Sequence, residues 1–106
     1  MGISEAILGE IIQRILSVCH PTRVILFGSA ATGTMNPDSD IDLLLVEKGV
    51  SDTRKESVRI RRALRGMGFP FDIIVMDSER YTKTKDYIGG IAYPAEKYGK
   101  VLYAAP

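Results

Sequence analysis

The chain is short of several residue types that often define a function class, and each shortage excludes something. Its single cysteine, Cys19, rules out an internal disulfide and a zinc site assembled from thiolates. We interpret Cys19 as a buried, inert thiol at the end of a helix. The single histidine, His20, precedes Pro21, and we interpret it as a cap or surface residue rather than as a metal ligand.

The chain also has a net charge close to zero, and it has no long apolar run. A formal net charge of +1 gives no general electrostatic case for nucleic-acid binding, so direct contact with nucleic acid is not expected. No apolar run approaches the ~18 residues that a membrane helix needs, and no signal peptide is visible. We therefore expect a cytoplasmic protein without a membrane partner. Its 106 residues suffice for one core, so we expect a single domain over residues 1–106.

Helical and strand-like apolar patterns alternate along the chain. Ser4 is a plausible N-cap for the first helix, and either Ser51 or Asp52 can cap the second. The predicted helices cover 4–19, 53–66, 79–85 (a short helix or a turn) and 91–98, and the predicted strands cover 23–27, 40–47, 71–76 and 101–103, with turn chemistry at 35–38. A strand, a helix and a strand over 40–76 suggest a right-handed parallel crossover. The pattern predicts an α/β (α+β) domain with a small mixed sheet flanked by helices.

Three aspartates occupy the openings of two predicted strands. Asp40 and Asp42 point to the same side because side chains alternate along a strand, and Asp72 starts the next strand. If the two strands are neighbours, the three carboxylates converge on one patch. Unpaired carboxylates repel each other, and Mg²⁺ takes oxygen ligands of this kind together with substrate phosphates. We expect two such ions, which can activate a hydroxyl and stabilise a leaving oxygen.

The turn at Gly28-Ser29 supplies groups of the opposite polarity. Glycine lets the backbone approach a phosphate, and a helical turn that starts at Ser29 directs free N–H groups towards it. Each feature alone has an ordinary explanation: Gly-Ser is common at strand ends, Asp-x-Asp can be a solvated turn, and Asp72 can simply cap a strand. Their combination, in this order and spacing, predicts a site that transfers a nucleotidyl group from a triphosphate.

The motif resembles the signature of a known superfamily. Gly28-Ser29-Ala30-Ala31-Thr32-Gly33 followed by Ser39-Asp40-Ile41-Asp42-Leu43 looks like that of the polymerase-beta-type nucleotidyltransferases. With so short a chain, the sequence is most similar to the minimal nucleotidyltransferases that act as antitoxins in two-gene toxin–antitoxin pairs. The resemblance implies that Asp40, Asp42 and Asp72 bind the metals. It also implies that Gly28, Ser29 and Gly33 belong to the nucleotide-binding motif.

The resemblance further implies a reaction and a partner. AMP would pass from ATP to a tyrosine on a helical toxin ribonuclease of the HEPN type. Two alternatives stay open: a binding module that neutralises its partner by occlusion, and a transferase that acts on a small molecule or an RNA end. One departure bears on the choice, because many relatives carry arginine at one or both of the positions held here by Ala30 and Thr32.

Two surfaces are candidates for docking a partner. The apolar face of helix 4–19 is wider than a surface helix needs, which indicates either a helix wedged between two elements or a contact with another chain. The predicted helix 53–66 has a basic face, which is either solvated or a docking surface. This face consists of Arg54, Lys55, Arg61, Arg62 and Arg65.

Overall fold

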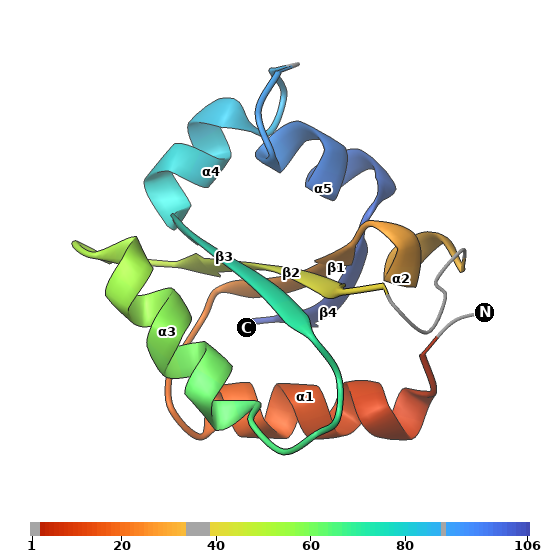
Figure 1. Ribbon diagram of the computed structural model, residues 1–106. Helices are drawn as coiled ribbons and strands as arrows, with labels where there is room; N and C mark the ends of the chain where they lie inside the picture. Colours follow the sequence, from red (N-terminus) through yellow and green to blue (C-terminus); the bar gives the residue numbers. More distant parts are fainter. Residues whose placement is uncertain (1–2, 34–38, 88) are drawn as a thin grey trace.

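The computed structural model describes residues 3–33, 39–87 and 89–106, and the predicted turn at 35–38 lies outside these ranges. The elements in chain order are α1 (Glu5–Leu16), β1 (Arg23–Phe27), α2 (Ser29–Thr32), β2 (Ile41–Glu47), α3 (Thr53–Ala63), β3 (Phe71–Asp77), α4 (Ser78–Thr84), α5 (Ala92–Tyr98) and β4 (Lys100–Ala104) (Figure 1). All eight predicted helices and strands are present. The structure adds α2, where the sequence indicated a helical turn.

The four strands form one mixed sheet in the order β3-β2-β1-β4. β2 and β3 run parallel, whereas β1 pairs with both β2 and β4 in antiparallel orientation. The parallel pair requires a crossover, and α3 provides it. The prediction of a mixed sheet flanked by helices is therefore confirmed. β3 and β4 are the two edges of the sheet.

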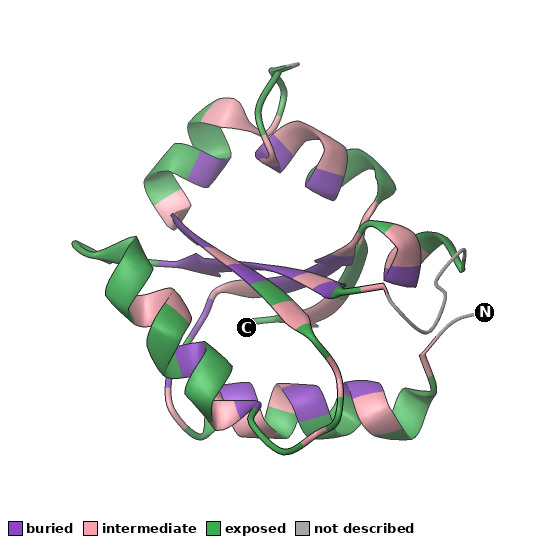
Figure 2. Cartoon of the chain, viewed as in Figure 1, coloured by how far each residue is buried: buried purple, intermediate pink, exposed green. Residues whose placement is uncertain are grey.

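Helices cover both faces of the sheet, with α1 and α3 on one side and α4 and α5 on the other (Figure 1). The two central strands are apolar along almost their whole length because they are buried on both faces (Figure 2). In β2, Ile41, Leu43 and Leu45 face α1 and α3, and the alternate residues Leu44 and Val46 face α4 and α5. The predicted alternation of β2 side chains is thus confirmed.

Helix ends differ from the predictions by a few residues. The Ser4 hydroxyl oxygen accepts a hydrogen bond from the backbone N–H of Ile7 (3.3 Å), and the Asp52 carboxylate accepts one from Lys55 (3.0 Å), so both caps form as expected. α1 ends at Leu16 rather than at residue 19, and its C-cap residue Ser17 donates its hydroxyl to the Arg14 carbonyl (2.6 Å).

The second predicted helix, 53–66, is also shorter in the structure. α3 ends at Ala63 with Leu64 as its C-cap, and Gly66 follows with a positive φ of 90°. A residue in this left-handed region cannot continue a right-handed helix. In the part of the chain that is described, no helix combines the length and apolarity needed to cross a bilayer.

Candidate active site

The parallel pairing of β2 and β3 places two of the predicted carboxylates side by side. Asp42 and Asp72 are direct partners in the register, one residue into each strand. Both belong to the face covered by α4 and α5, because Leu44 and Ile74, two residues further along, pack in the core on that side. Asp40 precedes β2 instead of lying within it, which corrects the predicted start of this strand by one residue.

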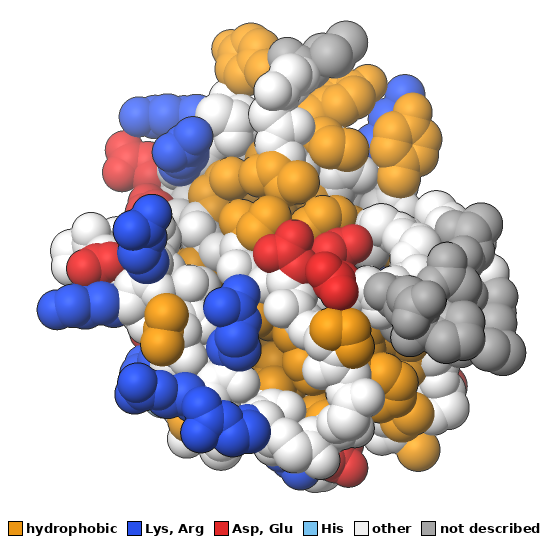
Figure 3. Space-filling view, viewed as in Figure 1, with side chains coloured by type: hydrophobic (Ala, Val, Ile, Leu, Met, Phe, Trp, Pro, Cys, Tyr) orange, Lys and Arg blue, Asp and Glu red, His pale blue; other side chains and the backbone are white. Residues whose placement is uncertain are grey.

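The three carboxylates form an uncompensated negative cluster. Burial raises the pKa of Asp42 above its ordinary value, and the neighbouring carboxylates of Asp72 and Asp40 raise this pKa further. Asp42 is half-buried, whereas Asp40 and Asp72 are exposed. None of the ion pairs found among the described residues involves any of the three. Acidic side chains are gathered over this end of β2 and β3, with apolar surface around them (Figure 3).

Gly28 lies directly against this cluster. Phe27 pairs with Asp42 across β1 and β2, so the next residue turns over the Asp42 side chain. Gly28 has a φ of 70°, and a Cβ atom at this position would lie 2.2 Å from Oδ2 of Asp42. No side chain fits there, and only glycine adopts this backbone angle readily. The bare backbone at residue 28 is therefore part of the carboxylate site.

The residues after Gly28 form the single turn of α2. The carbonyl of Gly28 accepts from the backbone N–H groups of Ala31 (3.1 Å) and Thr32 (3.3 Å), while the first N–H groups of a helix have no acceptor within it. Gly33 ends the turn with a φ of 78°. The other two predicted nucleotide-binding residues, Gly28 and Ser29, thus begin α2, next to Asp42.

The donor set fits a hard divalent cation. Carboxylate oxygens are preferred ligands of Mg²⁺, and the mutual repulsion that raises the pKa of Asp42 is relieved by a bound cation. A backbone without a side chain, as at Gly28, can approach a phosphate closely. The structure therefore brings Asp40, Asp42, Asp72, Gly28 and Ser29 to one place, with Gly33 at the far end of α2.

A second group of potential ligands was missed by sequence reasoning. Cys19, Glu47 and Glu56 lie at the opposite end of β2 and offer ligand atoms within 4.8 Å of one another. One signal in the sequence could have revealed this group. Glu47 continues the alternation of Ile41, Leu43 and Leu45, so its side chain points towards the same side of the sheet, below α1 and α3.

The family of the chain follows from a comparison with known protein families. Residues 6–93 match the nucleotidyltransferase domain, which is more than half of the chain, and the protein belongs to this family. The match covers both strands that carry the aspartates as well as the Gly28-Ser29 turn. No curated protein sequence matches the chain significantly.

Solved structures have the same fold. A protein from Sulfolobus solfataricus described as a nucleotidyltransferase is 25% identical, with a TM-score of 0.62 over 92% of this chain and 78% of the other. A toxin–antitoxin structure with AMP-PNP is 18% identical, and a mutant of the toxin–antitoxin pair MntA-HpeT is 16% identical. Their TM-scores are 0.64 and 0.63, each over 92% of this chain and 73% of the other. These likenesses establish the nucleotidyltransferase fold.

Proposed function

We propose that the protein is a magnesium-dependent nucleotidyltransferase that moves AMP from ATP to a hydroxyl group, and that this group is a tyrosine of a partner toxin that the protein neutralises. The observation that carries the proposal is the register of Asp42 beside Asp72, with the bare backbone of Gly28 against Asp42. Two structural neighbours are toxin–antitoxin structures, one of them with AMP-PNP, which supports the choice of partner and nucleotide.

Each residue of the site has a role in this reaction. Asp40, Asp42 and Asp72 would hold two magnesium ions, which when bound lower the cost of the charge that develops on the attacking and leaving oxygens. The backbone at Gly28 and the first turn of α2 bind the triphosphate, with the Ser29 hydroxyl as a further donor. Together these groups would position the triphosphate for attack by the acceptor oxygen.

The chemical step transfers one adenylyl group. The acceptor oxygen attacks the α-phosphorus, a new P–O bond forms, and the bond to the β-phosphate oxygen breaks, so that pyrophosphate leaves. Asp72 is exposed on the edge strand β3 and is the carboxylate best placed to take the proton of the acceptor hydroxyl. Because β3 is an edge, a large acceptor can reach Asp72 from outside the sheet.

The α2 turn distinguishes an enzyme from a binding module. Ala30 is buried and Thr32 is exposed, so α2 contributes no positive charge to a bound triphosphate. A hydrogen-bonded arginine at such a place contributes about 1.5–3 kcal/mol. Weak nucleotide binding would favour the second function, an antitoxin that acts by occlusion alone. Intact carboxylates favour the enzyme.

Incubation with labelled ATP, Mg²⁺ and the protein encoded beside this one tests the proposal. Label on a tyrosine of the partner is expected with the wild-type chain and lost in Asp40→Asn and Asp42→Asn. Asp86→Asn, a change to an exposed acid between α4 and α5, is the matched control and keeps full activity. Neutralisation of the partner that survives Asp42→Asn without any label contradicts the proposal and supports occlusion. Label on RNA or on a small molecule without a partner supports the third function.

A basic hollow at the start of the edge strand β3, on the α1–α3 side of the sheet, is the docking surface that we propose for the acceptor protein. It has a volume of about 520 Å³ and lies between the end of α3 and the start of β3. Its lining includes Arg61, Arg62, Arg65, Phe69 and Phe71, and the last of these directly precedes Asp72. No ion pair in the described part of the chain neutralises the three arginines. The hollow therefore favours an acidic segment.

The alternative docking surface, the apolar face of α1, is largely buried against the sheet. Leu8, Ile11 and Ile15 pack in the core, which favours the interpretation of a helix wedged against the sheet. The large hydrophobic side chains that are most exposed in the described ranges all lie elsewhere, at Val58, Tyr87, Tyr98 and Val101. Of the two predicted surfaces, the basic face is therefore the stronger candidate.

Charge reversal tests the hollow. Arg61→Glu with Arg65→Glu should weaken binding of the partner at least tenfold and leave affinity for ATP unchanged. Arg80→Glu with Lys83→Glu, two exposed changes on α4, is the control for net charge because it also reverses two charges. Equal effects of the two kinds of change would contradict a specific role for the hollow.

A further inference from the structure

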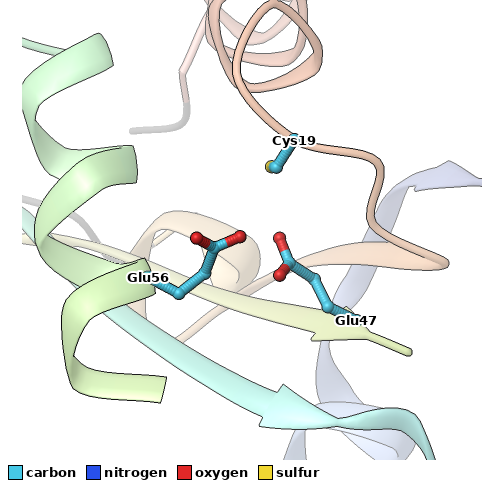
Figure 4. Close-up of side chains that lie close together, drawn as sticks. All are labelled: Cys19, Glu47 and Glu56. Carbon is cyan, nitrogen blue, oxygen red and sulfur yellow. The ribbon is translucent and has the colours of Figure 1, made fainter. Parts of the chain in front are cut away.

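A second cluster of ligand-type side chains lies at the far end of β2. Cys19 follows α1, Glu47 ends β2 and Glu56 belongs to the first half of α3. The three side chains point towards one another (Figure 4), and their ligand atoms all lie within 4.8 Å of each other. A thiol and two carboxylates from three separate segments are thereby brought to one point.

Glu47 carries the observation that points to a bound ligand. It is 5% exposed, and its Oε1 atom is buried without a hydrogen-bond partner in the described part of the chain. A buried polar atom left without a partner costs about 1–3 kcal/mol. Glu47 is directed into the cluster with Cys19 and Glu56 (Figure 4), so a ligand bound there would satisfy it.

The residues around Glu47 still have oxygen lone pairs with which to coordinate a cation. Arg59 contacts both oxygens of Glu56, at 2.9 Å from Nε and 2.8 Å from Nη2, and its Nη1 donates to the carbonyl of Val18. A carboxylate oxygen can accept two bonds, so Glu56 can contact Arg59 and still offer a ligand atom. Arg59 does not reach the free oxygen of Glu47 with any hydrogen bond.

The cluster is accessible from the surface. Glu47 and Glu56 line a hollow of about 410 Å³ together with Arg59 and the loop that follows β2. Through this hollow a small ion can reach the two carboxylates, and the buried thiol of Cys19 lies within 4.8 Å of their ligand atoms. Three protein ligands with a fourth position open to water are a common arrangement for zinc.

We propose that Cys19, Glu47 and Glu56 form a binding site for a single zinc ion, distinct from the aspartate site. Zinc accepts both thiolate and carboxylate ligands, whereas the hard Mg²⁺ ion does not favour sulfur. Binding replaces the thiol proton of Cys19, which passes to solvent, with a Zn–S bond. The ion ties the end of α1, the end of β2 and α3 together, so it stabilises the α1–α3 side of the sheet.

The two sites are separate in space. Asp42 lies near the start of β2 and Glu47 at its end, and the extended chain between them spans about 16 Å. They also belong to opposite faces, since Asp42 is on the α4–α5 side and Glu47 on the α1–α3 side. Zinc binding at the cluster can therefore be measured in a variant in which Asp40, Asp42 and Asp72 have been replaced.

The experiment uses a variant with Asp40, Asp42 and Asp72 all changed to Asn, reduced and stripped of metal. Zinc titration should show one ion per chain and a rise in Tm, and Co²⁺ should give a thiolate-to-cobalt charge-transfer band. Cys19→Ser should abolish the band, and Glu47→Gln should weaken zinc binding at least ~10-fold. Glu79→Gln, an exposed acid on α4, is the matched control and should change neither.

Clear results would overturn the proposal. One is the absence of the cobalt band from the folded parent variant, and another is zinc stabilisation that persists in both Cys19→Ser and Glu47→Gln. If Cys19→Ser does not fold, the cobalt band of the parent and the zinc affinity of Glu47→Gln decide the question. None of these measurements depends on nucleotidyl transfer.

Discussion

Gly28 and Asp42 approach so closely that the backbone of one excludes any side chain beside the carboxylate of the other. A Cβ atom on residue 28 would lie 2.2 Å from Oδ2 of Asp42. The approach results from the antiparallel pairing of Phe27 with Asp42, which brings the end of β1 to the start of β2. A single strand pairing thereby places the backbone of Gly28, which we propose binds phosphate, next to the carboxylate of Asp42, which we propose binds metal.

Gly28→Ala should destabilise the fold by at least about 2 kcal/mol, because it adds a steric overlap to the cost of a positive φ. Urea denaturation measures the change. Gly33→Ala is the matched control, since residue 33 has a similar φ of 78° but a Cβ added there would meet no atom of the described residues within 4 Å. It should lose only about 1 kcal/mol. Equal losses in the two variants would show that the overlap with Asp42 is unimportant.

Asp42→Asn should make the metal-free fold more stable while it removes nucleotidyl transfer. The substitution deletes the half-buried charge whose pKa is raised by burial, Asp72 and Asp40. We expect a gain of about 0.5–1 kcal/mol in urea denaturation with a chelator present. Asp86→Asn should leave both stability and activity unchanged. A destabilised Asp42→Asn variant would argue that the carboxylate has a structural partner.

The stability of the metal-free protein should depend on pH through Glu47. Burial and the facing Glu56 raise the pKa of Glu47 from 4.5 to about 7, although Arg59 nearby lowers it. The folded chain therefore holds a proton between these values that the unfolded chain releases, so stability falls as the pH rises from about 4.5 to about 7. The pKa of Glu56 is lowered from 4.5, so its titration changes stability only at pH values below this window.

Glu47→Gln should remove this pH dependence and raise stability by about 1–3 kcal/mol above the window. Urea denaturation on either side of the window, with a chelator present, measures it for both proteins. Glu79→Gln serves as the control because Glu79 is exposed. An unchanged slope in Glu47→Gln would place the titrating group elsewhere.

Gly99→Ala should lower the free energy of unfolding by about 1–3 kcal/mol, because the added Cβ atom overlaps its neighbours. A Cβ there would lie 2.4 Å from the carbonyl oxygen of Ala95 and 2.6 Å from Cγ2 of Ile25, while the φ of −78° suits any residue. Thermal denaturation measures the loss. Gly9→Ala is the counterpart in an open part of α1, and it should stabilise the helix by about 0.5–1 kcal/mol.

Much of the fold follows from local pattern. Continuous apolar runs located β1 and β2, and the strand–helix–strand order predicted the parallel pairing that aligns Asp42 with Asp72. Those features depend on residues close in sequence. The Gly28-Ser29 turn is compatible with many strand ends on its own, and its combination with the three aspartates indicated a phosphate site before the family resemblance was considered.

Other features depend on contacts that local pattern does not encode. The overlap between Gly28 and Asp42 arises only from the strand register. The cluster at Glu47 requires three segments to meet. Cys19 is buried as predicted, and the two glutamates that face its thiol could not be placed there from the sequence.

The pairing of β4 with β1 has a consequence for synthesis on the ribosome. β1 hydrogen-bonds with β2 on one side, and its other side is covered only when residues 100–104 arrive. The backbone N–H of Ala105 then donates to the carbonyl of Thr22 (2.9 Å). Until residue 105 has left the exit tunnel, a nascent chain exposes the edge of β1, so the sheet is completed late and a fused tag after this point needs a flexible spacer.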